Sequence, residues 1–328
     1  MKRKIEKIAL LTSGGDAPGM NAAIRAVVRA AAYYEKEIYG IYRGYEGLIE
    51  GDIERFGPRK VSNIINRGGT ILKSARSKEF RTPEGRKKAY ENLKKYEIDA
   101  LVVIGGDGSF RGMKVFSDEY DFPVMGIPAT IDNDINGTDY SIGFDTASNT
   151  AMEAIDKIRD TASSHDRLFF IEVMGRDAGF LALHSGIAGG AEDILIPEED
   201  RGINELLESL RRSKRSGKTS SIVVVAEGDK TGKNVFELAR YVENNLKEYE
   251  VRVVIIGHIQ RGGSPTTFDR VLASRLGVKA VEALLDGENK KVTGMRKNEI
   301  IVYPLEEATT KTKKINQELI RIIDILTV

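Results

Sequence analysis

The chain has 328 residues, which is long enough for roughly two domains that each bury a core of their own. Its 50 basic and 49 acidic residues leave a net charge of +1, which supports neither a nucleic acid nor an acidic membrane as a partner. The lack of cysteine excludes disulfides, zinc thiolates and thiol nucleophiles. No apolar run approaches the roughly 18 residues of a membrane helix, so we expect a cytoplasmic protein.

The first predicted unit is a strand, a glycine turn and a helix. Residues 5–12 are apolar, residues 13–19 read Ser-Gly-Gly-Asp-Ala-Pro-Gly, and residues 20–33 have helical periodicity. Backbone N–H groups in such a turn, together with the helix N-terminus, favour a bound phosphate. The turn matches neither a Walker A sequence nor G-x-G-x-x-G, so by itself it is more typical of an ordinary structural turn.

Two arginines share one face of that predicted helix. Arg25 and Arg29 are four residues apart, and like charges at this spacing cost a few tenths of a kcal/mol. An anion bound by both would reverse the sign of that interaction. A solvated basic face explains the pair equally well at this stage.

The second predicted strand end carries a lone carboxylate among glycines. After a short strand over 38–42, glycine-rich loops and an exposed helix over 84–96, residues 98–105 form an apolar run typical of a buried central parallel strand. It ends in Gly105-Gly106-Asp107-Gly108-Ser109. The glycines permit backbone conformations closed to other residues, which leaves Asp107 room for a hydrated Mg²⁺.

A third strand, over 123–127, ends at a proline and leads into Thr130-Ile131-Asp132-Asn133-Asp134. If this loop is extended, Asp132 and Asp134 lie roughly 6 to 7 Å apart at about 3.3 Å per residue. They then repel by roughly 2 to 3 kcal/mol at an effective dielectric of about 20, so we expect a cation nearby. The alternative is a turn rich in Asp and Asn. Because ligands bind at the carboxyl ends of parallel strands, we expect the three loops to converge.

The second half repeats the alternation of strands, glycine-rich ends and helices. Strands are predicted over 168–173, 193–196, 221–226 and 252–256, and helices over 147–160, 204–212, 235–247, 269–285 and 314–326. This pattern predicts an α/β protein with two doubly wound, Rossmann-like lobes, mainly parallel sheets and an active site in the cleft between them. The predicted lobes are 1–142 with 259–305, and 143–258 with 306–328.

Basic residues gather at the predicted strand ends of this second half. They are Arg167, Arg176, Arg252, His258 and Arg261, and Glu227 accompanies them. The planar guanidinium fork matches a phosphate group. Any one of these arginines is more often a surface residue, but the set predicts a site for a phosphorylated small molecule.

With these residues in view, the sequence resembles the bacterial ATP-dependent 6-phosphofructokinases over nearly its whole length. The matching blocks are 12–29, 65–76, 98–109, 130–144, 155–165, 172–176 and 257–265. The resemblance implies a homotetrameric glycolytic enzyme that transfers the γ-phosphoryl group of ATP to the 1-hydroxyl of fructose 6-phosphate.

The resemblance also implies roles for single residues. Asp132 matches the base that takes the hydroxyl proton, and Asp107 matches the Mg²⁺ ligand. Residues that match assisting groups are Thr130, Asp134 and Arg176. Residues that match the nucleotide site are Gly15, Arg76, Ser77, Gly106, Asp107, Gly108 and Ser109. Residues that match the sugar-phosphate site are Thr130, Ile131, Asp132, Arg167, Met174, Gly175, Arg176, Glu227, Arg252, His258, Ile259, Gln260 and Arg261. In the family, those that match Arg167 and Arg252 reach in from a neighbouring subunit.

A regulatory site for ADP or phosphoenolpyruvate is implied as well. Its matching residues are Arg25, Arg29, Arg159, Gly190, Glu192 and Lys218, and such an effector is the anion that the Arg25 and Arg29 pair favours. Two departures weaken this expectation: the family's lysine-rich turn is Ser-Gly-Lys-Thr-Ser here, over 216–220, and Pro58 replaces an arginine.

The phosphoryl donor is set by two small residues. Pyrophosphate users of the family have Lys at the position of Ala129 and Asp at the position of Gly108, whereas ATP users have Gly at both. Two small residues favour ATP, although Ala129 is not the usual one. The alternatives are a pyrophosphate-dependent phosphofructokinase and a non-catalytic sugar-phosphate sensor, and the sensor has no need of Asp132. NAD and lipid kinases share the Gly-Gly-Asp-Gly run but lack the block over 257–263.

Overall fold

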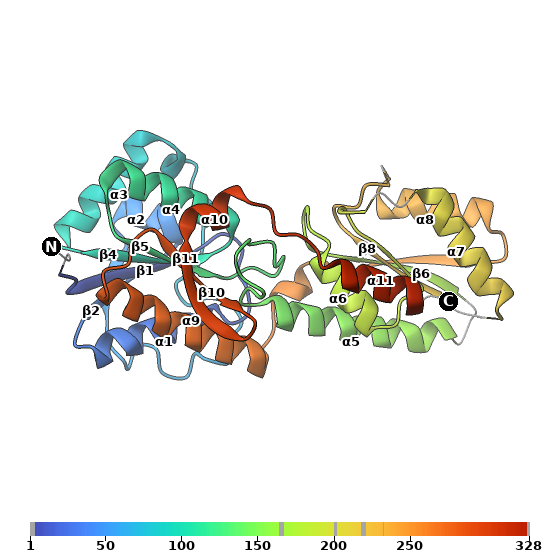
Figure 1. Ribbon diagram of the computed structural model, residues 1–328, viewed down its shortest axis with the longest axis horizontal. Helices are drawn as coiled ribbons and strands as arrows, with labels where there is room; N and C mark the ends of the chain where they lie inside the picture. The colour runs from blue at the N-terminus through green and yellow to red at the C-terminus, as the bar shows by residue number, and fades with distance from the viewer. Residues whose placement is uncertain (1–3, 164–166, 200–201, 218–220, 232, 327–328) are drawn as a thin grey trace. The chain divides into compact units, whose positions relative to one another are not determined.

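The computed structural model describes residues 4–163, 167–199, 202–217, 221–231 and 233–326. The chain forms two compact units: Met1–Thr146 with Arg261–Lys313, and Ala147–Gln260 with Lys314–Val328. Each unit is built on its own sheet, with mainly parallel strands and helices on both faces (Figure 1). The predicted α/β class with two Rossmann-like lobes is confirmed.

The first unit contains a seven-stranded sheet in the order β11-β10-β5-β4-β1-β2-β3. The strands are β1 (Lys7–Ser13), β2 (Glu37–Ile41), β3 (Ile53–Phe56), β4 (Ala100–Gly105), β5 (Val124–Pro128), β10 (Lys291–Arg296) and β11 (Glu299–Pro304). The five central strands are parallel, and the two edge strands, β3 and β11, pair antiparallel. In the register, Ser13 pairs with Gly105, and Gly105 pairs with Pro128. The three strand ends that carry the predicted loops are therefore neighbours.

Helices cover both faces of this sheet. They are α1 (Met20–Tyr33), α2 (Gly44–Glu50), α3 (Pro83–Lys95), α4 (Asp107–Tyr120), α9 (Thr267–Leu285) and α10 (Leu305–Thr310), with a 3₁₀ turn, η1 (Glu79–Arg81). Helices α1 and α9 pack together on one face, and α2, α3, α4 and α10 lie on the other (Figure 1). Buried aromatic side chains fill the second face, among them Phe80, Phe110, Phe116 and Phe122.

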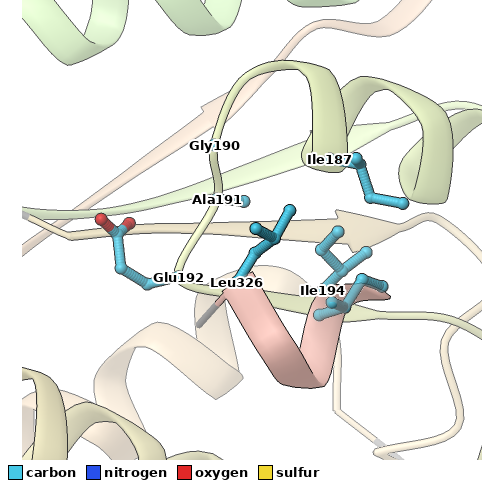
Figure 2. Close-up of a pocket in the computed structure, with 7 residues that line it drawn as sticks. Ile187, Gly190, Ala191, Glu192, Ile194 and Leu326 are labelled. Atoms are coloured by element: carbon cyan, nitrogen blue, oxygen red, sulfur yellow. The ribbon is translucent and has the colours of Figure 1, made fainter. Parts of the chain in front are cut away.

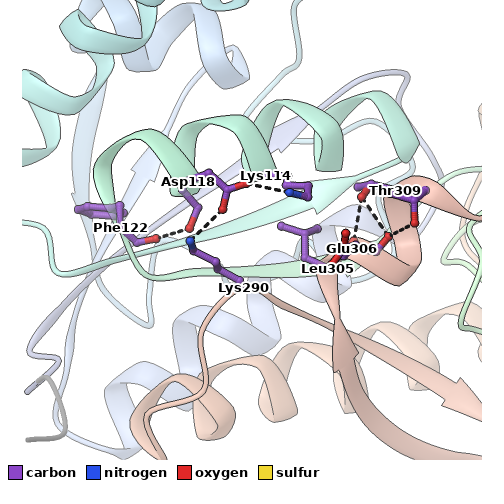
Figure 3. Close-up of polar contacts among 9 residues, drawn as sticks. Lys114, Asp118, Phe122, Lys290, Leu305, Glu306 and Thr309 are labelled. Carbon is purple, nitrogen blue, oxygen red and sulfur yellow. Dashed lines mark hydrogen bonds and ion pairs between the residues drawn. The ribbon is translucent and has the colours of Figure 1, made fainter.

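Helix α10 packs on α4, and the residue that precedes β10, Lys290, also contacts α4. Figure 3 shows Asp118 of α4, whose carboxylate oxygens accept from Lys114 and Lys290, each at 2.8 Å. Within α10, Thr309 donates to the Leu305 carbonyl at 3.1 Å. Residues 306–313 were assigned to the other lobe from the sequence, but they group with the first unit because α10 packs on α4 and β10.

The second unit contains a parallel four-stranded sheet in the order β7-β8-β6-β9. Its elements are α5 (Phe144–Ser163), β6 (Arg167–Val173), α6 (Phe180–Ala188), β7 (Asp193–Leu195), α7 (Ile203–Arg215), β8 (Ser221–Ala226), α8 (Val235–Asn245), β9 (Glu250–Ile255), η2 (Gly257–Arg261) and α11 (Gln317–Leu326). Leucines of α7 and α8 pack on Phe170 of β6, while α6 covers β7 and β8 and is contacted by α11. Every residue of β8 is buried, as is typical of a strand covered on both faces.

The elements that the sequence left unpredicted are mostly short or rich in charge. They are α2, β3, α4, α6, α10 and the hairpin of β10 and β11. No helix in the described ranges combines the length and the apolar character that crossing a bilayer requires.

Candidate active site

The three predicted loops of the first unit lie in contact. A Cβ atom added to Gly14 would stand 3.3 Å from Ser109 Oγ, and one added to Gly106 would stand 3.5 Å from Thr130 Cβ. The turn after β1 therefore touches the start of α4, which in turn touches the loop after β5. This convergence follows from the register of the three parallel strands.

The glycine-rich loop after β4 becomes the first turn of α4. Asp107 is the first residue of the helix, and the backbone N–H groups of Ser109 and Phe110 donate to the Gly106 carbonyl. Around the position that a Cβ of Gly108 would occupy there is nothing within 4 Å. An open helix N-terminus with small residues is well suited to phosphate oxygens.

Asp107 fits a metal ion that arrives with a nucleotide. Its side chain is 24% exposed and its carboxylate pairs with Arg111 at 2.8 Å. In the part of the chain that the structure describes, no group of three or more His, Asp or Glu side chains could hold a metal. Mg²⁺ in kinase sites usually takes one or two carboxylates and completes its shell with water and phosphate oxygens. A single accessible carboxylate beside an open glycine therefore agrees with Mg²⁺.

The loop after β5 is folded back on itself and held by Asn133. This buried residue has a left-handed backbone, with φ of 52°, and its side chain accepts from Ser141 N at 2.9 Å and donates to the Asp139 carbonyl at 3.2 Å. Ser141 Oγ donates to the Thr130 carbonyl at 2.7 Å. The extended loop considered from the sequence is wrong, because these bonds impose a turn. The turn places buried Asp132 beside Thr130, whose Oγ1 accepts from Asp132 N at 3.2 Å.

Arg76 and Ser77 lie on a loop that side chains of β1 and α1 pin in place. The Asn21 amide donates to the Arg67 and Gly69 carbonyls at 2.8 and 2.7 Å, and Thr12 Oγ1 donates to the Lys73 carbonyl at 2.7 Å. Ser77 Oγ accepts from Phe80 N at 3.1 Å and so begins η1. Arg76 is exposed. Asn21 and Thr12 were not predicted, and their one signal in the sequence is a polar residue inside an apolar run.

Arg261 stands over the glycine turn of the first unit. Its Nη1 donates to the Asp16 carbonyl at 3.2 Å, and a Cβ on Gly15 would lie 2.5 Å from the same nitrogen. The residue was assigned from the resemblance to the sugar-phosphate site. Within the first unit its charge also lies beside a predicted nucleotide residue.

In the second unit, the loops after β6 and β8 carry one predicted cluster. Met174, Gly175 and Arg176 follow β6, and Glu227 follows β8, with the Arg176 backbone N–H donating to Glu227 Oε1 at 2.7 Å. Burial, and then the charges of Glu227 and Asp229, raise the pKa of Glu172 on β6. Negative charge is therefore concentrated at the carboxyl ends of β6 and β8. Carboxylate oxygens there can accept hydrogen bonds from sugar hydroxyls.

The 3₁₀ turn η2 follows β9 at the same edge. It carries the predicted His258, Ile259 and Gln260. Ile259 is 63% exposed, whereas Gln260 is buried and donates to the Gly257 carbonyl at 3.0 Å.

Arg167 and Arg252 lie at the opposite edge of this sheet. Arg167 is the first residue of β6 and pairs in register with Glu250, and Arg252 follows within β9. Glu250 accepts from both arginines, from Arg167 Nε at 3.2 Å and from Arg252 Nη2. At about 3.3 Å per residue, the six steps along β6 separate its two ends by roughly 20 Å. Within one chain these two arginines therefore do not join the cluster of Arg176 and Glu227.

The predicted effector residues of the second unit lie together. Arg159 Nη2 donates to the Gly190 carbonyl at 2.5 Å, and its Nη1 lies 3.5 Å from Glu192 Oε1. A cavity of about 50 Å³ is lined by Gly190 and Glu192 together with apolar side chains such as Ile187 and Leu326, and Figure 2 shows how these residues lie. The remaining predicted residues are on α1 of the first unit, where Arg25 is partly exposed and Arg29 is exposed, and at Lys218, which lies outside the described residues.

The chain is similar to known proteins over nearly its whole length. Residues 7–284 match the family model described as Phosphofructokinase. The chain is 56% identical over 322 residues to ATP-dependent 6-phosphofructokinase 1 of Thermus thermophilus, covering 98% of this chain and 99% of that protein. It is 53% identical over 324 residues to ATP-dependent 6-phosphofructokinase 2 of Bacteroides thetaiotaomicron, covering 99% of both.

A solved structure extends the likeness to three dimensions. The T-state phosphofructokinase of Pichia pastoris superposes with a TM-score of 0.90 at 37% identity. The match covers 99% of this chain and 37% of that longer chain. The family model matches most of the chain and the relatives match over nearly their whole length, so the chain belongs to the phosphofructokinase family.

Proposed function

We propose that this chain is an ATP-dependent 6-phosphofructokinase of glycolysis, which transfers the γ-phosphoryl group of ATP to the 1-hydroxyl of fructose 6-phosphate and yields fructose 1,6-bisphosphate and ADP. One observation carries the proposal above the others. The buried Asp132 sits in a loop whose Thr130 is in contact with the glycine-rich start of α4. A base for the sugar hydroxyl thereby lies next to a predicted nucleotide loop.

The residues of the first unit then divide the chemistry. Phosphoryl transfer needs little covalent help and depends on placed charges and one group that orients the attacking hydroxyl. Asp132 accepts the proton of the 1-hydroxyl at a carboxylate oxygen, and Thr130 and Asp134 support it. Arg76 and Arg261 offer guanidinium donors to phosphate oxygens. When bound, Mg²⁺ supplies further positive charge to those oxygens, and Asp107 would hold it. The remaining predicted nucleotide residues are Gly15, Ser77, Gly106, Gly108 and Ser109.

The second unit supplies the groups for the sugar phosphate. Glu227 accepts a sugar hydroxyl, while Arg176 and His258 donate to the substrate. The backbone at Met174 and Gly175, and the side chains of η2, complete this set. Arg167 and Arg252 serve the sugar phosphate of a neighbouring copy in a homotetramer, which agrees with their position at the other edge of the sheet.

ATP is the proposed donor because two positions are small. Gly108 has open space where a side chain would begin, and Ala129 is buried after β5. Neither offers the charge that a pyrophosphate site in this family carries. Regulation by ADP or phosphoenolpyruvate would use Arg25, Arg29, Arg159, Gly190, Glu192 and Lys218.

A steady-state assay with fructose 6-phosphate tests the proposal. Turnover is measured with ATP and with pyrophosphate as donors, with and without Mg²⁺, and over a range of ADP concentrations. We expect turnover with ATP and Mg²⁺ alone. Turnover with pyrophosphate in place of ATP would identify the other donor class. Binding of fructose 6-phosphate by calorimetry, without turnover on either donor, would identify a sensor.

A further inference from the structure

The chain that follows α10 lies along the loop that follows Asp134. Ile135 and Thr312 form an antiparallel bridge, and the Asn136 side chain donates to the Glu307 carbonyl at 3.2 Å. Both contacts join residues more than 150 positions apart in the sequence. The loop that carries the predicted base is therefore braced from outside by the segment that ends the first unit.

Lys313 is the lysine of this segment that bonds to the loop. Its Nζ donates to the Asp139 carbonyl at 2.8 Å, and its side chain is partly buried. Burial lowers the pKa of Lys313 to about 8, while the charges of Asp139 and Asp134 act against that shift. The antiparallel bridge of Ile135 and Thr312 sets Lys313 opposite Asp134, and the charges of Asp134 and Asp139 favour its ammonium form.

We propose that Lys313 is a positioning residue for phosphoryl transfer: its ammonium group offsets the charge of Asp134 and ties the loop at Asp139, so that Asp132 stays ionised and aimed at the sugar hydroxyl. The inference rests on the proposed function. Its physical reason is the repulsion of carboxylates that share one short loop. A second carboxylate nearby favours the protonated form of a base, and a cation on that second carboxylate removes the effect.

Four variants separate the charge of Lys313 from its hydrogen bond. Lys313→Met removes both, Lys313→Gln keeps a donor for the Asp139 carbonyl, Lys313→Arg keeps the charge, and Lys311→Met is the matched control on an exposed lysine nearby. We expect Met and Gln to lower kcat about tenfold, equivalent to about 1.4 kcal/mol, with KM for fructose 6-phosphate within about twofold. We expect Arg and the control to stay within about twofold of the parent in both constants.

A double-mutant cycle with Asp134→Asn tests the partner. If Lys313 acts through Asp134, Lys313→Met has little further effect on kcat once that charge is gone. Additive losses would overturn the proposal. A parental kcat in Lys313→Met would also overturn it. So would equal activity in Lys313→Gln and Lys313→Arg, because the lysine would then act only through its hydrogen bond to the loop.

A titration that needs no turnover keeps the test independent of the proposed function. The pKa of Lys313 is read by ¹³C NMR of the reductively methylated protein, with and without Asp134→Asn. We expect the substitution to lower that pKa further, because Asp134 raises it. If the pKa of Lys313 is the same in the parent and in Asp134→Asn, the inference is overturned. This result does not require any Lys313 variant to fold. An inactive parent with a shifted pKa overturns the proposed function and leaves the coupling standing.

Discussion

The two units hold their predicted site residues in different ways. In the first unit these residues gather at the carboxyl ends of neighbouring strands, and buried amides such as Asn21 and Asn133 pin the loops that carry them. In the second unit they divide between two edges of the sheet, and Arg167 and Arg252 are held by an exposed carboxylate, Glu250. Within one chain, the first unit brings its predicted residues together. The second unit keeps Arg167 and Arg252 away from its other predicted residues.

This difference has an energetic side. Leaving a buried polar group without its partner costs about 1 to 3 kcal/mol, whereas an exposed ion pair contributes about 0 to 1 kcal/mol. Substitutions in the loops of the first unit should therefore lower both stability and kcat. Substitutions at the arginine edge of the second unit should change substrate affinity and leave stability nearly unchanged.

The largest effect is expected at Asp132. Asp132→Ser should lower kcat by about 10²- to 10⁴-fold, the usual contribution of a positioned proton acceptor, with little change in KM. Steady-state kinetics with fructose 6-phosphate and ATP measure both constants. Asp118→Ser, on the outer face of α4, is the control and should keep the parental kcat. A turnover near the parental value in Asp132→Ser would remove this residue from the role of base.

The next effect sharpens the contrast in loop anchoring. Asn133→Ala removes a buried and a partly buried hydrogen bond, and alanine lacks the side-chain amide that helps asparagine adopt a left-handed conformation. The free energy of unfolding should therefore fall by roughly 2 to 5 kcal/mol, with kcat falling too. Urea unfolding measures the loss. Asn298→Ala is the matched control, because Asn298 is also left-handed, with φ of 67°, but lies at an exposed hairpin turn. It should lose only about 1 to 2 kcal/mol. Equal losses in the two variants would show that the amide of Asn133 does not hold the loop.

The sequence pattern predicted those helices and strands whose bounds depend on neighbouring residues. The helix over 20–33 and the strand over 221–226 have the predicted bounds, because a continuous apolar stripe or run sets them. The hairpin of β10 and β11 was missed because its turn, Lys297-Asn298, lacks the Asn-Gly signal that marks a tight hairpin.

Long-range contacts lie beyond such patterns. Asn21 bonds a carbonyl 46 residues away, and Lys313 bonds one 174 residues away, so no local spacing encodes either. The strand direction could have separated Arg167 from Arg176, since they bracket β6, but a strand end alone does not say which edge of the sheet it faces.

A smaller effect concerns pH and the start of α5 in the first unit. Asp269 accepts from Gly143 N at 2.8 Å and from Thr146 N at 2.9 Å, and burial raises its pKa from 3.8 to about 6 against these hydrogen bonds. The folded state therefore holds this proton more tightly than the unfolded state. The contribution of Asp269 to stability is greatest below pH 4 and falls by up to about 3 kcal/mol as pH rises through 6.

Asp269→Asn tests this contribution. The variant should be less stable than the parent at pH 4, because the amide cannot accept every bond, and the gap should narrow towards pH 7. Chemical unfolding at pH 4, 5, 6 and 7 measures the difference in the free energy of unfolding. Asp286→Asn, at an exposed position, is the control and should show the same dependence on pH as the parent. A gap that stays constant with pH would show that Asp269 does not titrate in this range.

The smallest single change tests the arginine edge of the second unit. Arg252→Met should raise KM for fructose 6-phosphate about 10- to 100-fold, as expected for one charge-assisted bond to phosphate, with a stability change below about 1 kcal/mol. Steady-state kinetics and urea unfolding give the two numbers. A large loss of stability would place Arg252 in the structural framework of the sheet.

Mixing two defective chains decides which site Arg252 serves. If it reaches a neighbouring copy, a hybrid of Asp132→Ser and Arg252→Met chains contains some sites with an intact Asp132 from one chain and an intact Arg252 from the other. Such a mixture, refolded or exchanged together, should recover activity at low fructose 6-phosphate that neither parent shows. If Arg252 serves its own chain, every site lacks one of the two groups and no activity returns. Recovery would explain why Arg167 and Arg252 lie apart from Arg176 within one chain. These arginines would then contribute to the site of a neighbouring chain.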